Sequence, residues 1–164
     1  MKTSYIGLGA NLGDAVATLQ WALQRLDASA ECQLRACSSF YRSRPLADMD
    51  QPDYVNAVAE LVTDLSPPAL LALLHRIEDE QGRERLQRWG ARTLDLDILL
   101  YADVQWQTAS LTIPHIGLTQ REFVVFPLLE IAPQLVLPDG RQLAEVAQGL
   151  DWRGMEKMTS GEHA

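Results

Sequence analysis

The sequence predicts a single α+β domain with a ferredoxin-like core, in which strands and helices follow the order β-α-β-β-α-β. Apolar residues recur at every second position in some segments and at helical spacing in others, which indicates strands and helices in turn. Their order matches the split β-α-β pattern. A length of 164 residues suits one domain with an ordinary core, and an apolar content of 47% argues against disorder.

The first half of the chain supplies three strands and one helix of this core. Residues 3–9 alternate as a short buried strand, and apolar residues at helical spacing predict a helix over residues 13–26. Strand character returns in residues 33–44 and again in residues 54–63. The loop between these two strands is polar, so we expect it to be exposed.

A second helix and the last core strand follow. Ser66 and Pro67 are typical of the start of a helix, and Gly82 is expected to end it. Leucines and an isoleucine in between form one apolar stripe, which predicts that this helix packs on the sheet. Residues 93–101 form the strand.

Additions to the core are expected after this strand. Residues 102–114 leave the sheet and return as a hairpin, and short C-terminal helices follow, broken by Pro127 and Pro133. The core is therefore expected to cover residues 3–140, and residues 141–164 are expected to form a polar tail.

Composition limits the partners and the compartment. The net charge of -8 makes the chain a poor candidate for binding a long polyanion such as duplex DNA. No apolar run reaches the roughly 20 residues of a membrane span, and the N-terminus lacks the apolar stretch of a signal peptide. We expect a cytoplasmic monomer that uses no nucleic acid or membrane, with Cys32 and Cys37 as small buried thiols kept reduced.

A cluster of basic residues interrupts this acidic chain within ten positions: Arg83, Arg85, Arg88 and Arg92. Taken alone, such a cluster is most often a solvated loop held by ion pairs. The other interpretation is a local site for a small anionic ligand.

The segment "RWGARTLDLDILLY" places two carboxylates, Asp95 and Asp97, in a strand that otherwise reads as buried. Since side chains alternate along a strand, both acids point to one face. The other face is apolar: Leu94, Leu96, Ile98 and Leu100. Two neighbouring carboxylates repel each other and need a positive partner. That partner is either an arginine, as in an edge-strand salt bridge, or a hard cation, and ligation by oxygen alone favours Mg²⁺ over Zn²⁺.

Other patterns carry less information. Glycines at positions 7, 9 and 13 miss the spacing of a phosphate-binding loop, so we interpret "GLGANLGD" as a tight turn between strand and helix that only glycines fit. His115 follows Pro114 in a predicted turn, from which its ring can reach a site. His75 lies within a helix and is expected to be structural or exposed.

Three segments together resemble the 6-hydroxymethyl-7,8-dihydropterin pyrophosphokinases of folate biosynthesis: "QPDYVNAV", "QGRERLQRWGARTLDLDILLY" and "LTIPHIGLTQREFVVFPLLEIAP". The resemblance implies transfer of the terminal pyrophosphoryl group of ATP to the hydroxymethyl group of the reduced pterin, with release of AMP and use of two Mg²⁺ ions. It implies that Asp95 and Asp97 bind the metals, and that Arg83 and Arg92 hold the phosphates and complete the catalytic set.

The same resemblance assigns binding residues for both substrates. Nucleotide contacts would come from Arg83, Arg85, Arg92, Thr112, His115 and Arg121. For the pterin, Tyr54 and Phe123 would sandwich the ring and Asn56 would read its hydrogen-bonding edge. Further residues would line this site: Glu78, Arg85, Arg88, Trp89, Arg92, Asp95 and Thr112. Without the resemblance, Tyr54 and Phe123 would be interpreted as core residues and Asn56 as a strand-end cap.

Two rival functions predict different behaviour. Another two-metal transferase, acting on nucleic acid, would need a broad basic surface, which the acidic balance opposes. A ferredoxin-like ligand-binding regulatory domain without catalysis would need neither the paired acids nor the arginines. Such a domain would bind ATP, if at all, without releasing AMP.

Overall fold

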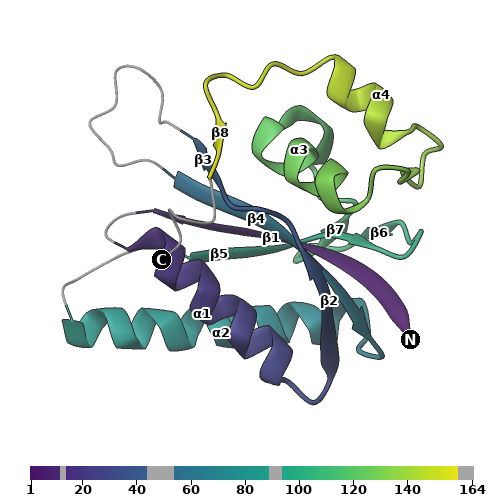
Figure 1. Ribbon diagram of the computed structural model, residues 1–164. Helices are drawn as coiled ribbons and strands as arrows, with labels where there is room; N and C mark the ends of the chain where they lie inside the picture. Colours follow the sequence, from purple (N-terminus) through teal and green to yellow (C-terminus); the bar gives the residue numbers. More distant parts are fainter. Residues whose placement is uncertain (12–13, 44–53, 89–93, 159–164) are drawn as a thin grey trace.

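In the computed structural model, a six-stranded antiparallel sheet lies between two groups of helices (Figure 1). The structure describes residues 1–11, 14–43, 54–88 and 94–158, and of residues 83–88 it describes the backbone alone.

The sheet is built from β1 (Lys2–Asn11), β2 (Cys32–Cys37), β3 (Tyr41–Ser43), β4 (Tyr54–Thr63), β5 (Leu94–Tyr101) and β8 (Glu156–Lys157). The helices are α1 (Ala15–Ala28), α2 (Pro67–Arg88), α3 (Glu122–Ile131) and α4 (Leu143–Gln148), with a 3-10 turn, η1 (Leu118–Gln120). The expected hairpin is present as β6 (Trp106–Gln107) and β7 (Thr112–Ile113).

The strand order confirms the predicted ferredoxin-like core. β1 lies between β5 and β4, and β2 and β3 both pair with β4 on its other side, all antiparallel. Each helical connection, α1 and α2, therefore links two strands that have a third strand between them, which is the split β-α-β arrangement. In Figure 1, α1 and α2 cover one face of the sheet and α3 and α4 the other.

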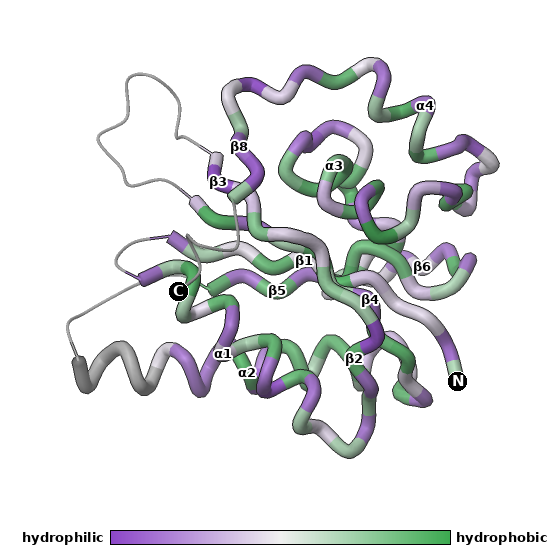
Figure 2. The backbone as a smooth tube through the Cα atoms, in the orientation of Figure 1, coloured by the Kyte–Doolittle hydropathy of each residue, from purple (hydrophilic) through white to green (hydrophobic). Residues whose placement is uncertain are grey.

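Each face of the sheet has its own apolar core, and β1 contributes to both. Ile6, Leu8 and Ala10 are buried in the cluster on the side of α1 and α2. On the opposite face, Tyr5 packs against a second cluster that includes Leu128 of α3. Figure 2 shows hydrophobic and hydrophilic stretches alternating along α1 and α2, as expected for helices with one buried side.

A β-bulge in β5 places Leu100 on the face opposite to the predicted one. Tyr5 pairs with Leu100 and Ile6 pairs with Ile98, so Leu99 is one extra residue on β5. The extra residue reverses the alternation beyond it. Leu100 consequently joins Leu99 in the cluster on the side of α3, instead of sharing the face of Ile98.

The strand predicted over residues 33–44 is divided into β2 and β3. Cys37 pairs with Ala59 and Tyr41 pairs with Asn56, so four steps on one strand face three on the other. Ser38 bridges the irregular point: its backbone N–H donates to the Val58 carbonyl at 2.8 Å, and its hydroxyl accepts from the Val58 N–H at 2.9 Å. The prediction of one strand missed this bulge.

Two predicted helix breaks are wrong. α2 continues through Gly82, because the residues that follow are mainly strong helix formers, and a mid-helix glycine costs only about 1 kcal/mol. α3 continues through Pro127, which is buried on the helix. Proline removes one backbone donor, but burial of the apolar residues around it keeps the helix intact up to Ile131.

Residues of the expected polar tail take part in the fold. Leu143 of α4 is fully buried in the α3-side cluster, and β8 extends the sheet by pairing with β3. Among the described residues, no helix combines the length and the apolar character that crossing a membrane requires.

Candidate active site

The strand register brings the two predicted substrate-binding elements together around β1. Gly9 of β1 pairs with Asn56 of β4 on one side and with Asp95 of β5 on the other. Two residues earlier, Gly7 pairs with Asp97. Directly paired residues share a face of the sheet, so the amide of Asn56 and both carboxylates project to the same side as the two glycines.

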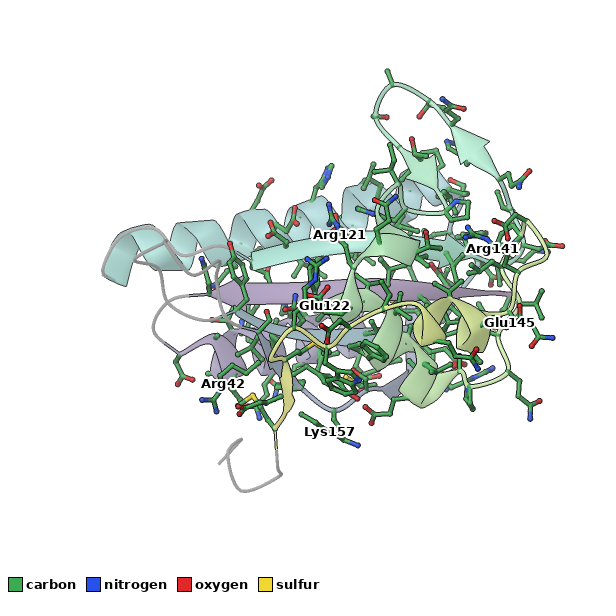
Figure 3. The ribbon with its side chains drawn as sticks, turned by 90° about the horizontal axis from the view of Figure 1, so that it is seen from above. Arg42, Arg121, Glu122, Arg141, Glu145 and Lys157 are labelled. Carbon is green, nitrogen blue, oxygen red and sulfur yellow. The ribbon has the colours of Figure 1, made fainter. Side chains whose placement is uncertain are left out.

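These residues line one cavity of about 390 Å³ between the sheet and the start of α3. Its walls come from five regions that are distant in sequence: β1, β3, β4, β5 and the segment from His115 to α3. Figure 3 shows Arg121 and Glu122 above the middle of the sheet, whereas Arg141 and Glu145 lie at the far end toward α4.

The floor of the cavity includes two glycines of β1, Gly7 and Gly9. Gly7 and Gly9 lie inside β1 and not in a turn, so the turn interpretation of this motif is wrong for both. A Cβ atom on Gly9 would lie 2.9 Å from Asn56 Nδ2, and one on Gly7 would lie 3.3 Å from Leu99 Cδ2. The missing side chains keep the space between the amide and the carboxylates open.

The paired carboxylates sit at the β5 side of the cavity. Burial, and then the charge of Asp97, raise the pKa of Asp95 above its ordinary value. Asp97 Oδ2 lies 4.0 Å from His115 Nε2, too far for a hydrogen bond. Two repelling carboxylates with oxygen donors fit a hard divalent cation such as Mg²⁺. In the described part of the chain, no three His, Cys, Asp or Glu side chains form a complete metal-binding group.

The aromatic and amide side chains lie on the opposite side. Tyr54 and Phe123 both line the cavity, and the guanidinium carbon of Arg121 lies 5.8 Å from the centre of the Phe123 ring. Ser43 Oγ donates a hydrogen bond of 3.3 Å to Asn56 Oδ1, which orients the amide. Sequence reasoning missed Ser43, because its only signal was its position two residues after Tyr41 on a strand that was expected to continue.

Glu78 occupies a different place from the other predicted pterin-site residues. It lies on α2, and its Oε2 accepts a 2.8 Å hydrogen bond from the backbone N–H of Leu96, which closes part of the exposed edge of β5. Burial raises the pKa of Glu78, and the charges of Asp95 and Asp97 raise it further. Its carboxylate is therefore near the pair, although it does not line the cavity.

Seven of the predicted site residues line the cavity together: Tyr54, Asn56, Asp95, Asp97, His115, Arg121 and Phe123. Thr112 is on β7 and exposed, outside the lining. Arg83, Arg85 and Arg88 lie in α2, where the structure describes only their backbone. Trp89 and Arg92 lie outside the described residues. His75 is exposed, as predicted.

The chain matches the family model of 7,8-dihydro-6-hydroxymethylpterin-pyrophosphokinase (HPPK) over residues 5–133. It is 53% identical over 148 residues to the 2-amino-4-hydroxy-6-hydroxymethyldihydropteridine pyrophosphokinase of Haemophilus influenzae, covering 90% of this chain and 92% of that protein. It is 45% identical to the protein of the same name from Pseudomonas aeruginosa, covering 94% of this chain and 95% of that one.

Solved structures with the same fold are much more distant in sequence. A crystal structure described as HPPK-DHPS in complex with substrates superposes with a TM-score of 0.71 at 11% identity. Plasmodium falciparum HPPK-DHPS superposes with a TM-score of 0.70 at 13% identity. The chain spans 43% of the length of each of these two, and the likeness supports the fold alone.

Proposed function

Because this chain belongs to the 7,8-dihydro-6-hydroxymethylpterin-pyrophosphokinase family, we propose that it transfers pyrophosphate from ATP to the hydroxymethyl group of 6-hydroxymethyl-7,8-dihydropterin, a step of folate biosynthesis. The observation that carries this function is the shared cavity. One side offers an amide and two aromatic rings, and the other offers two carboxylates that fit a cation. A flat heterocycle and a metal-bound polyphosphate would thus meet over the bare floor of β1.

In this reaction the hydroxymethyl oxygen attacks the β-phosphorus of ATP. A new oxygen–phosphorus bond forms, the bond from the β-phosphorus to the oxygen bridging the α-phosphate breaks, and AMP leaves with that electron pair. The hydroxyl proton passes to solvent. Bound Mg²⁺ would neutralise charge on the phosphate oxygens. We propose two such ions, held by Asp95 and Asp97.

The chain's own residues bind and orient the two substrates. Tyr54 and Phe123 would hold the ring by its faces, and Asn56, held by Ser43, would hydrogen-bond its edge. His115, beside Asp97, and Arg121, over the Phe123 ring, both line the cavity, and they would offer a donor and a positive charge to the nucleotide. Arg83, Arg85 and Arg92 complete the proposed phosphate contacts. Positioning of this kind supplies much of the rate enhancement in phosphoryl transfer.

The test is incubation of the protein with ATP, Mg²⁺ and hydroxymethyl dihydropterin, followed by separation of the nucleotides. AMP formed in proportion to pyrophosphorylated pterin supports the proposal. ADP would indicate transfer of a single phosphoryl group, and ATP binding without AMP would favour a regulatory domain. We further propose that the protein acts as a cytoplasmic monomer, which size-exclusion chromatography and cell fractionation would test.

A further inference from the structure

A second cluster of polar side chains joins α3 to β3 outside the cavity. Glu130, near the end of α3, accepts hydrogen bonds from the Ser39 N–H at 3.0 Å and the Ser39 hydroxyl at 2.9 Å through Oε2. Its Oε1 accepts a hydrogen bond from the Tyr41 hydroxyl. We name Glu130, Ser39 and Tyr41 the Glu130 clamp.

The position of Glu130 on its helix indicates a specific role. A carboxylate in the last turn of a helix is disfavoured by the helix dipole, so Glu130 does not serve the stability of α3 itself. Three donors converge on it, two from Ser39 just before β3 and one from Tyr41 of β3. Hydrogen bonds to an ionised acceptor are stronger than neutral ones and hold a narrower geometry.

The clamp and the cavity lie along the same two elements. Phe123 and Glu130 are seven residues apart on α3, which is nearly two full turns and about 10 Å, so their side chains share one face of the helix. On β3, Tyr41 is the direct cross-strand partner of Asn56, and Ser43 is the partner of Tyr54. The clamp thus links α3 to β3 near the Glu130 end of the helix. Phe123 lies at the other end of the helix, where it lines the cavity together with Tyr54.

The C-terminal segment covers this cluster. The Trp152 ring stacks on Phe126 of α3 at a centroid distance of 4.6 Å and lies 6.0 Å from the Tyr41 ring. β8 continues the cover, since Lys157 pairs with Tyr41 in the sheet. Tyr41 is only 3% exposed under this cover, so its hydroxyl is held toward Glu130 and has little access to solvent.

We propose that the Glu130 clamp is a positioning device for pterin binding, which fixes α3 against β3 so that Phe123 keeps its place opposite Tyr54 and Asn56. This proposal rests on the proposed function. Weakening the clamp would let the start of α3 shift relative to β3. The two aromatic faces would then no longer match a flat ring, whereas the carboxylate pair on β5, at the other side of the cavity, would be unaffected.

The main test measures the binding of each substrate by calorimetric titration with the Glu130→Gln variant. Glutamine keeps the size of the side chain but removes its charge and one acceptor oxygen. We expect the Kd of the pterin to rise about three- to tenfold, the change that loss of one net hydrogen bond produces. The Kd of Mg²⁺ with a non-hydrolysable ATP analogue should rise clearly less, because Arg121 alone among the described nucleotide contacts adjoins α3. An unchanged pterin Kd in the folded variant, or an equal rise for both ligands, would overturn the proposal.

Glu145→Gln is the matched control, because it removes the same charge from the exposed side of neighbouring α4. We expect both Kd values of this control to equal those of the wild type. Should Glu130→Gln fail to fold, Tyr41→Phe removes only one hydroxyl oxygen and carries the same expectation. In the Glu130→Gln/Tyr41→Phe double variant, the two effects should be less than additive, because both substitutions act on the same hydrogen bond between Tyr41 and Glu130. Full additivity would contradict the clamp.

Failure of the clamp and failure of the proposed function give different results. A merely structural role would lower the melting temperature without changing the pterin Kd of the folded protein. If the wild type binds the pterin but forms no AMP, the proposed function fails while the clamp is still tested by the Kd values. If the wild type binds no pterin, both proposals fail.

Discussion

A Cβ atom on Gly9 would approach Asn56 Nδ2 to 2.9 Å, so the bare backbone at Gly9 is a condition for the pose of the Asn56 amide. The Gly9→Ala variant is therefore expected to displace the amide into the cavity and weaken pterin binding. We expect an increase of about tenfold or more in the pterin KM, since a buried polar contact is lost and partly replaced by a clash. Steady-state kinetics with each substrate varied in turn would measure it.

Gly7→Ala provides the comparison for this variant. It adds the same methyl group to the same strand and face, but the new atom would meet Leu99 Cδ2 at 3.3 Å, an apolar contact that needs a shift of only a few tenths of an ångström and displaces no polar group. Alanine is also favoured over glycine within a strand by about 0.5–1 kcal/mol. We expect a clearly smaller change in the pterin KM than for Gly9→Ala, and equal effects would refute this account of the floor.

Neutralising one member of the carboxylate pair is expected to remove metal-dependent activity without unfolding the protein. Asp95 and Asp97 repel each other when no cation lies between them, so Asp97→Asn relieves a repulsion in the metal-free protein. Since a metal supplies several kcal/mol of charge stabilisation, we expect AMP formation to fall at least about 100-fold. The readouts are AMP formation and the melting temperature with and without Mg²⁺ and a non-hydrolysable ATP analogue.

Asp139→Asn is the control for this change. Asp139 forms an exposed ion pair with Arg141 at 2.8 Å, and Figure 3 shows Arg141 far from Arg121 and Glu122 of the site. The activity of the Asp139→Asn variant and its stabilisation by the ligands should match those of the wild type. Near-normal turnover of Asp97→Asn would instead remove that residue from the proposed metal site.

The order of the elements could be predicted from the sequence because it depends on local periodicity. The errors have one physical cause: tertiary burial overrides local rules. Pro127 lies inside α3 and Gly82 inside α2, although each was expected to end its helix. The bulge at Leu99 adds one residue to β5, and no local pattern distinguishes it from regular alternation in a run of leucines.

For the site, residue types that carry chemistry could be recognised in the sequence, but residues whose role depends on their neighbours in space could not. Asp95 and Asp97 were identified from their spacing on a strand, which depends only on alternation. The role of Gly9 depends on the distance to Asn56 across the sheet, and that of Glu130 on donors in a strand about 90 positions earlier. Such relations require the register of strands and helices, which the sequence pattern leaves open.

The clamp also predicts how stability depends on pH. Burial alone would raise the pKa of Glu130, but hydrogen bonds from Tyr41 and Ser39 and the charge of Lys157 together lower it below its ordinary value of 4.5. Because the folded pKa is lowered, the ionised group stabilises the fold above pH 4.5, and this contribution is lost as the pH falls through the folded pKa.

We therefore expect Glu130→Gln to be less stable than the wild type at neutral pH, and the difference to shrink as the pH falls below 4.5. Urea unfolding at a series of pH values would measure it. Burial and Glu130 itself raise the pKa values of the Tyr41 hydroxyl and the Cys37 thiol beside it, so neither of these two groups changes its charge in this range. A difference that is constant from pH 7 to about pH 3 would contradict the assignment.

The thiol of Cys37, on β2, is a second probe of the Glu130 carboxylate. Burial and then the charge of Glu130 raise the pKa of its thiol from 9.0 to about 11, so at pH 8 it forms about 100-fold less thiolate than an ordinary cysteine. In a Cys32→Ala background, we expect Cys37 of the native protein to react with a disulfide reagent at least about tenfold more slowly than the unfolded chain, because the greater nucleophilicity of a higher-pKa thiolate offsets part of the loss of thiolate. Adding Glu130→Gln should lower the thiol pKa and speed the reaction, because one negative charge is removed. A rate unchanged by this substitution would place the Glu130 carboxylate too far away to act on the thiol.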